Sequence, residues 1–351
     1  MRTIILSAAF VALGIPAVLA APAKDRAWEA CISDDSAASI RGCTQVLARG
    51  SRETAKTRGG AHFNRGLEYA KAGRTEEALA DLKAAIDLRP DWGRPHKQMA
   101  SVYRKMGKGD LAFAAINRGI ELEPDLPGGY YVRADLLDDR GDLEGALADA
   151  TRAIRQEPDE WAPYNLRGYI LNKKKEHARA LVDFNAGLRH EANNAVLYSN
   201  RAWSFSQMGH LEAALADYDY SIQLASDRAG VLNSRGVLHS RMGNVDLALA
   251  DFDRAIRLKP DFRTARENRV DMLLRKKDCK TALPELDKLI AEESKPMLLA
   301  FRGSCQGTLG NISAALGDFD AALARQPELQ LAVAGRRKAQ EVLAGTPSAS
   351  Y

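Results

Sequence analysis

The chain has 351 residues, of which 46% are hydrophobic and 27% are charged, and its formal net charge is +4. This apolar content supports a sizeable core, while a mean hydropathy of −0.32 argues against a protein that crosses a membrane many times. The 50 basic and 46 acidic residues nearly cancel. The chain therefore lacks the strong overall positive charge expected of a nucleic-acid-binding protein.

Residues 1–20 have the layout of a cleavable secretory signal. Arg2 gives the segment a short positive start, residues 4–19 are largely apolar, and a small residue, Ala20, closes it. We expect cleavage after Ala20, with Ala23 as the alternative; a buried N-terminal helix is the competing interpretation. No second apolar run is long enough to span a bilayer. The mature chain is therefore predicted to be periplasmic or secreted, without membrane insertion.

Residues 21–58 are predicted to form a partial helical hairpin. Their pattern is a degenerate copy of the unit that follows, with Ser39 in the place of its central alanine. Cys43 stands where that unit carries a large apolar residue.

Residues 59–327 contain eight copies of this unit. A small residue recurs at steps of 34 and finally 33 residues, with Val270 as the larger exception: Gly66, Ala100, Ala134, Gly168, Ala202, Gly236, Val270 and Gly303. An alanine follows each of them after twelve residues: Ala78, Ala112, Ala146, Ala180, Ala214, Ala248, Ala282 and Ala315. A mostly large apolar residue follows after sixteen, with Ala150 as the exception: Leu82, Ile116, Phe184, Tyr218, Phe252, Leu286 and Phe319.

Each unit is predicted to be a helical hairpin. Apolar residues at three- and four-residue spacing give both halves of the unit a stripe to bury. Glycine stands seven residues after the small residue in six units, with Lys175 and Lys277 in the other two, and provides a turn. Proline stops the second helix, because its ring cannot continue the hydrogen-bond ladder, at Pro90, Pro124, Pro158, Pro260 and Pro327.

This pattern resembles the tetratricopeptide repeat over residues 59–327. The resemblance implies an all-α, right-handed solenoid of about eight tandem hairpins, whose first helices line a concave groove. Residues 328–345 are expected to form a C-terminal capping helix with a polar outer side carrying Arg336, Arg337 and Lys338, and residues 346–351 a disordered tail. The fold is well specified by this match, but a fold does not by itself specify an activity.

One charged position departs from the usual pattern of the family, which has an apolar residue there. Arginine precedes the small residue in seven units: Arg65, Arg133, Arg167, Arg201, Arg235, Arg269 and Arg302. An acid lies fifteen residues after the small residue in the same seven: Asp81, Asp149, Asp183, Asp217, Asp251, Glu285 and Asp318. The second unit lacks both, with Met99 and Ala115. We predict an Arg–carboxylate pair joining the two helices of each hairpin, the alternative being a row of ligand-binding arginines.

Four cysteines in a secreted chain predict two disulfides out of three possible connectivities. Neighbouring helices of a stack are adjacent whereas its ends are far apart, which favours the local pairs Cys31–Cys43 and Cys279–Cys305. A zinc site is the alternative, but the sequence contains no C-x-x-C.

No catalytic motif accompanies the repeats. There is no G-x-x-x-x-G-K and no H-E-x-x-H, and the six histidines never pair at helical ligand spacing. Residues 303–307 superficially resemble a nucleophile elbow, yet the repeat register places them inside a helix. We therefore predict neither an enzymatic activity nor a cofactor or metal.

The resemblance places several polar and aromatic residues in the groove. The second unit contributes a basic stripe, Arg94, Lys97, Arg104 and Lys105, and the third Tyr131 with the acidic Asp135, Asp138 and Asp139. Tyr169 and Trp203 lie 34 residues apart and could form an aromatic shelf, near Asn165, Asn200 and Asn233. Such residue types commonly anchor binding surfaces. The competing interpretation is solvated charge together with packing between repeats.

The leading functional hypothesis is a protein- or peptide-binding adaptor of the bacterial envelope that uses this groove. The alternative is a structural subunit of a secretion or cell-wall assembly, built in by its edges and convex face.

Overall fold

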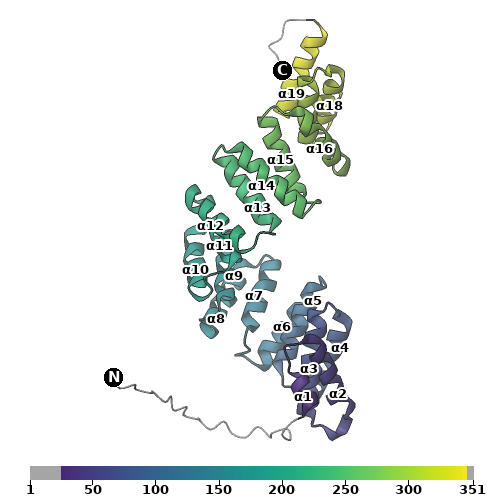
Figure 1. The fold of residues 1–351 in the computed structure, drawn as a ribbon, viewed down its shortest axis with the longest axis vertical. Coiled ribbons are helices and arrows are strands. Elements are labelled where there is room, and N and C mark those ends of the chain that lie inside the picture. The colour runs from purple at the N-terminus through teal and green to yellow at the C-terminus, as the bar shows by residue number, and fades with distance from the viewer. Residues whose placement is uncertain (1–24, 346–351) are drawn as a thin grey trace, which may run out of the picture. The chain divides into compact units, whose positions relative to one another are not determined.

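The computed structural model describes residues 25–345, and over that range the chain has nineteen α-helices, one short 3₁₀ helix and no strand. The predicted signal, residues 1–20, and the predicted tail, residues 346–351, lie outside the described residues. The chain divides into two compact units, Met1–Glu157 and Pro158–Tyr351 (Figure 1). Within residues 25–345, no helix combines the length and the apolar character that a bilayer span requires.

The helices follow one another in hairpins. The first unit contains α1 (Arg26–Cys31), α2 (Ser36–Ala48), the 3₁₀ helix η1 (Gly50–Arg52), α3 (Ala55–Lys71), α4 (Thr75–Leu88), α5 (Gly93–Lys105), α6 (Gly109–Leu122), α7 (Gly129–Asp139) and α8 (Leu143–Gln156). The second contains α9 (Trp161–Lys173), α10 (His177–His190), α11 (Ala195–Gln207), α12 (Leu211–Leu224), α13 (Ala229–Arg241), α14 (Val245–Leu258), α15 (Arg263–Arg275), α16 (Cys279–Glu292), α17 (Pro296–Thr308), α18 (Ile312–Arg325) and α19 (Gln330–Leu343).

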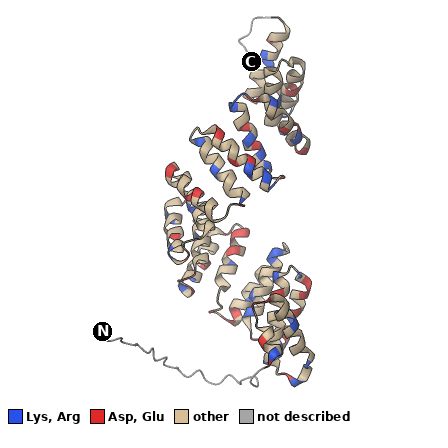
Figure 2. Ribbon diagram, in the orientation of Figure 1, with Lys and Arg blue, Asp and Glu red and all other residues tan. Residues whose placement is uncertain are grey.

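Each odd-numbered helix from α1 to α17 packs against the helix that follows it, and α19 packs against α17 and α18. The predicted fold class, an all-α array of tandem hairpins, is confirmed. Basic and acidic residues are interspersed along the helices of both units (Figure 2).

The intra-hairpin turns of all eight repeats use a residue with left-handed backbone conformation. Six are glycines at the predicted turn position, such as Gly209 with φ of 82°. Lys175 and Lys277 occupy the same position in the other two turns and adopt the same conformation, with φ of 63° and 57°. A left-handed conformation costs a residue with a Cβ roughly 1 kcal/mol, so the turn geometry prevails over local preference at both lysines.

The small residue of the repeat is required where an aromatic ring faces it. A Cβ added to Gly168 would lie 2.7 Å from the ring of Phe184, and one added to Gly236 would lie 2.6 Å from Phe252. Both rings are fully buried between the helices of their own hairpin. The glycines therefore allow close helix approach around a large core side chain.

The predicted Arg–carboxylate pair forms in six of the seven hairpins. In each, Nε and Nη2 of the arginine donate to the two carboxylate oxygens over 2.6–2.9 Å: Arg65–Asp81, Arg133–Asp149, Arg167–Asp183, Arg201–Asp217, Arg235–Asp251 and Arg302–Asp318. All six aspartates are buried. Burial alone would raise the pKa of Asp81, but hydrogen bonds from Arg65 and His62 hold that pKa below its usual value. We call these six pairs the hairpin ladder.

The prediction is wrong for the seventh hairpin. Glu285 pairs there with Arg266, one turn earlier on α15, and not with Arg269. Arg266 is buried and also donates to Glu292 over 2.5 Å. Glutamate is one methylene longer than the aspartate of the other hairpins, and an arginine stands within its reach. Arg269 instead donates to Asp253 of the preceding hairpin over 2.5 Å.

The ladder arginines also bind the preceding hairpin, which the sequence analysis did not predict. Nη1 of Arg235, for example, donates to Asp219 over 2.7 Å, and Asp219 lies two residues after the ladder acid Asp217. The acceptor occupies the corresponding place for the ladder arginines Arg133 with Asn117, Arg201 with Asn185 and Arg302 with Asp287. Arg269, outside the ladder, reaches the same place, Asp253, through Nε. One guanidinium thus holds a hairpin together and fixes its register against the one before.

The cysteine prediction is confirmed in its pairing. Cys31 on α1 pairs with Cys43 on α2, with 4.4 Å between their Cα atoms. Cys279 on α16 pairs with Cys305 on α17, with 5.0 Å between theirs. The described residues contain no unpaired cysteine.

Replacing Asp217 with alanine should destabilise the α11–α12 hairpin by about 2–3 kcal/mol, because the partly buried Arg201 loses its bidentate partner. Replacing Asp219, whose side chain is 55% exposed, should lower the free energy of unfolding by less than about 1 kcal/mol. Urea denaturation followed by circular dichroism compares the two variants, and hydrogen exchange in α11 and α12 locates the loss.

The second hairpin suggests the control, since Met99 and Ala115 replace both members of the pair there. The double variant Arg201→Met, Asp217→Ala should recover part of the stability that Asp217→Ala loses, because no charge is left without a partner. A double variant less stable than Asp217→Ala would contradict this account.

Both disulfides should be found in the protein isolated from its native compartment. Peptide mapping without reductant should yield the Cys31–Cys43 and Cys279–Cys305 peptides, and the double variant Cys279→Ala, Cys305→Ala should lose roughly 2–4 kcal/mol of stability. Free thiols, or a peptide that joins the two ends of the chain, would contradict the prediction.

Candidate functional site

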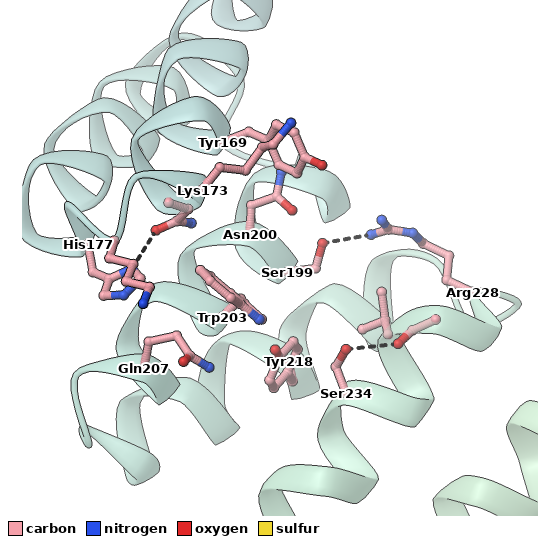
Figure 3. A pocket seen from close by; sticks show the side chains of 14 residues that line it. Tyr169, Lys173, His177, Ser199, Asn200, Trp203, Gln207, Tyr218, Arg228 and Ser234 are labelled. Atoms are coloured by element: carbon pink, nitrogen blue, oxygen red, sulfur yellow. Dashed lines mark hydrogen bonds between the residues drawn. The ribbon is translucent and has the colours of Figure 1, made fainter. Parts of the chain in front are cut away.

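A pocket of about 850 Å³ opens within the second unit, along the first helices of three successive hairpins. Its walls come from α9, α11 and α13, with contributions from the α9–α10 turn and from the start of α10 and the middle of α12. Figure 3 shows the Trp203 ring in the middle of these side chains, with His177 to its left and Arg228 to its right. We refer to it as the α9–α13 pocket.

Two exposed aromatic side chains line the pocket. Tyr169 on α9 is 45% exposed, and Trp203, at the corresponding place on α11, is 38% exposed. The predicted shelf therefore has its two members on one surface. The His177 ring meets the edge of Trp203 with 5.3 Å between centroids. Lys173 lies with Nζ 5.7 Å from the centroid of the Tyr169 ring. These contacts fix the orientation of both rings while leaving part of each accessible.

The polar wall of the pocket is tied together by side-chain hydrogen bonds. The buried Asn172 carboxamide oxygen accepts from Ser204 over 2.9 Å and lies 3.1 Å from Nδ1 of His177. The amide of Asn200 donates to Asn165 over 2.9 Å, so two of the predicted asparagines are joined. Asn233 instead accepts from Asn268 over 2.9 Å and does not line the pocket.

Arg228 closes the pocket on the α13 side. Its Nη1 donates to the carbonyl oxygen of Ala195 over 2.8 Å, to Ser199 Oγ over 3.2 Å and to Ser221 Oγ over 3.3 Å. These bonds hold Nη1 of the guanidinium against α11 and α12. Burial lowers the pKa of Arg228, an effect that the attraction of Asp227 opposes.

Tyr218 reaches the pocket from α12 and stays neutral at physiological pH. Burial raises the pKa of its hydroxyl to about 12, an effect that a hydrogen bond with Ser234 opposes.

The candidate residues of the first unit are arranged differently. Arg104 on α5 pairs with Asp135 over 2.7 Å and with Asp139 over 2.7 Å, both on α7. The charges of the predicted basic and acidic stripes thus compensate each other at Arg104. Lys97 donates to the carbonyl oxygen of Pro127 over 2.7 Å. The pKa of Asp135 is raised, and burial is the main cause.

The remaining candidates of the first unit are scattered. Arg94 and Lys105 are exposed, Tyr131 is half-buried, and Asp138 is buried. A second hollow of about 220 Å³ lies beside Arg104 and Asp139. These residues do not come together in one enclosed site.

Apart from the tyrosines, Asn200 is the only charged or polar residue of the α9–α13 pocket lining that the sequence predicted. Lys175 departs from glycine at a repeated turn position, and that departure was a usable signal. Arg228 and Ser199 occupy positions without a recurring residue type, so the 34-residue period cannot single them out.

Sequence models described as the tetratricopeptide repeat match residues 59–92, 131–195, 200–261 and 233–296, which together exceed half of the chain. The chain belongs to the tetratricopeptide repeat family. Repeats of this family generally serve as scaffolds for protein–protein interaction. A comparison with curated protein sequences gave no match.

Two solved structures show the same repeat fold. The chain is similar to one in the crystal structure of the APC/C hetero-tetramer Cut9-Hcn1, with 16% identity and a TM-score of 0.60. That match covers 67% of this chain but only 46% of the other, so this chain spans less than half of that relative. It is also similar to PilF of Pseudomonas aeruginosa, with 20% identity and a TM-score of 0.54, over 61% of this chain and 97% of PilF. At these identities the likeness concerns the fold alone.

Proposed function

We propose that this tetratricopeptide repeat protein is a non-enzymatic scaffold of the bacterial envelope that binds a protein or peptide in the α9–α13 pocket. The observation that carries the proposal is the pair Tyr169 and Trp203, which expose aromatic surface to one pocket from successive first helices. Partly exposed tryptophan and tyrosine in a concave site are the side chains that most often dominate binding energy.

The polar lining suits a peptide backbone. Asn200 and Gln207 present carboxamides to the pocket, and Ser234 and Tyr218 present hydroxyls. Carboxamides and hydroxyls can both donate to a peptide carbonyl and accept from a peptide N–H. An extended segment placed across α9, α11 and α13 could therefore satisfy its backbone while a side chain packs on Trp203.

The first unit offers less support for binding. Arg104 is neutralised by Asp135 and Asp139, and its hollow is about a quarter of the size of the α9–α13 pocket. Exposed charge pairs of this kind mainly influence encounter rate and register. We therefore restrict the proposed binding surface to the hairpins that begin with α9, α11 and α13.

The envelope location rests on the predicted signal in residues 1–20 and on the cysteines. Disulfides persist in oxidising compartments and are rare in a reducing cytoplasm. Two cysteine pairs at disulfide distance are compatible with a periplasmic or secreted chain.

A structural subunit remains the second candidate, because apolar side chains are exposed away from the pocket. Val182 on α10 is 66% exposed and Leu247 on α14 is 53% exposed. The predicted polar cap, α19, also exposes Leu331, Val333, Val342 and Leu343 beside its basic residues. Such surface could join neighbouring subunits of an assembly.

Binding in the pocket should depend on Trp203. A photoreactive amino acid at position 169 should capture the partner in the native envelope, whereas one at the exposed position 247 should not. With the captured partner in hand, Trp203→Ala should weaken binding at least about fivefold, because the ring supplies the largest apolar contact.

Val237 provides the matched control, since it occupies the same repeat position one hairpin later, is also 38% exposed and does not line the pocket. Val237→Ala should bind like the parent. Normal binding by Trp203→Ala, with capture only from position 247, would favour the structural subunit.

The N-terminal segment should direct export and then be removed. Sequencing of the mature protein from the bacterial envelope should begin at Ala21, or at Lys24 if cleavage follows Ala23. A variant that lacks residues 2–20 should remain in the cytoplasm with reduced cysteines. Recovery of the full chain, starting at Met1, from the envelope would contradict the prediction.

A further inference from the structure

We propose that the α9–α13 pocket selects an acidic peptide segment, in which one side-chain carboxylate meets Arg228, a second acid faces Lys175 and an apolar side chain covers Trp203. This inference rests on the proposed function and specifies the chemistry of the partner.

The first observation is the charge of the lining. Among the fourteen side chains that line the pocket, Lys173, Lys175 and Arg228 are cationic, and none is an aspartate or a glutamate. This contrasts with the near balance of basic and acidic residues in the chain as a whole. A concave site with one sign of charge focuses its field on an oppositely charged ligand.

The second observation is the bonding of Arg228. The ladder arginines each bind a carboxylate through Nε and Nη2, as Arg201 does with Asp217. Arg228 uses only Nη1, and its three acceptors are all neutral oxygens. The adjacent Asp227 is exposed and does not line the pocket. The guanidinium is thus fixed in place by neutral groups, with the edge that normally binds a carboxylate left to a ligand.

Lys175 adds a second cation across the pocket from Arg228. It lies in the α9–α10 turn, is exposed and lines the pocket. An ammonium on a flexible, exposed side chain attracts a carboxylate without fixing its geometry, whereas the guanidinium orients one. The two side chains therefore have complementary parts in selecting an acid.

The remaining lining favours a peptide over a polyanion such as a nucleic acid or polyphosphate. Trp203 and Tyr169 present exposed aromatic surface next to the carboxamides of Asn200 and Gln207. A polyanion would be matched by a longer row of cations, and its binding would depend chiefly on their number. A mixed acidic and apolar segment uses every class of side chain in the pocket.

The test begins with a phage-displayed library of random twelve-residue peptides, selected on the full mature chain and counter-selected on Trp203→Ala. Recovered peptides should be enriched in aspartate and glutamate together with at least one large apolar residue. The best peptide is then synthesised with a fluorescent label and both ends capped, beside a form whose acids are replaced by their amides. Fluorescence anisotropy should give at least about tenfold weaker binding for the amide form.

The capped ends distinguish recognition of a side-chain carboxylate from recognition of the carboxylate at the chain terminus. The same peptide with a free C-terminal carboxylate should bind with the affinity of the capped form. Strong binding of the free-ended peptide alone would identify the terminus as the recognised group and overturn the proposal.

Two variants with matched controls connect the selectivity to named residues. Lys175→Asn should weaken binding of the acidic peptide and leave its amide form unaffected, whereas Lys277→Asn, at the same turn position outside the pocket, should change neither. Arg228→Gln is compared with Arg254→Gln, which removes a guanidinium that donates to the carbonyl oxygen of Ser226 outside the pocket. Equal losses for the acidic and amide peptides would overturn the charge pairing.

The outcomes separate this inference from the proposed function. A selection without any binder would contradict both. Neutral or basic binders that still require Trp203 would overturn only the preference for acids. Polyphosphate that binds as tightly as the acidic peptide, and equally well to Trp203→Ala, would replace the peptide with a polyanion and overturn the inference.

Discussion

The arginine–carboxylate pair inside six of the hairpins is the interaction on which the rest of this structure depends. Each of the six buried aspartates of the hairpin ladder would be costly without a cation, and the bidentate guanidinium satisfies both of its oxygens. Because Nη1 of the same arginine reaches the preceding hairpin, as Arg235 reaches Asp219, one side chain sets both the closure of a hairpin and its register on its neighbour. The pair therefore specifies geometry that apolar packing alone would leave less sharply defined.

The ladder also determines which surface is left for binding. Arg201 and Trp203 are two residues apart on α11, which is about 200° around a helix, so they face nearly opposite sides. Arg201 points to its carboxylate on α12, while Trp203 lines the pocket. The arginines are thus engaged in structure, and the alternative interpretation of them as a ligand-binding row loses its basis in these six hairpins. The residue two places after the ladder arginine, which is Trp203 on α11, is the one that is free to vary with the partner.

The sequence predicts those contacts that recur with the period and fails where they do not. Hairpins, turns and the ladder follow from residues at fixed repeat positions, and even Lys175 and Lys277 obey the turn geometry. The local cysteine pairs follow from the adjacency of neighbouring helices. The exchange at Glu285 depends on a side-chain length and on a nearby arginine, neither of which the period records. Arg228 likewise stands at a position without a repeated residue type, so only the folded chain brings it to Trp203.

This division between repeated and unrepeated positions explains how one scaffold can carry a selective site. The repeated arginines of the ladder are neutralised within the structure, and Arg104, which stands at a position without a recurring charge, is neutralised by nearby acids. A charge can therefore contribute to recognition only where the repeat pattern is broken and no compensating acid follows. Arg228 meets that condition, because its fixed partners are neutral oxygens, and it stands in a pocket whose aromatic surface already favours a ligand. Selectivity in this protein accordingly resides in the few side chains that the repeat does not dictate.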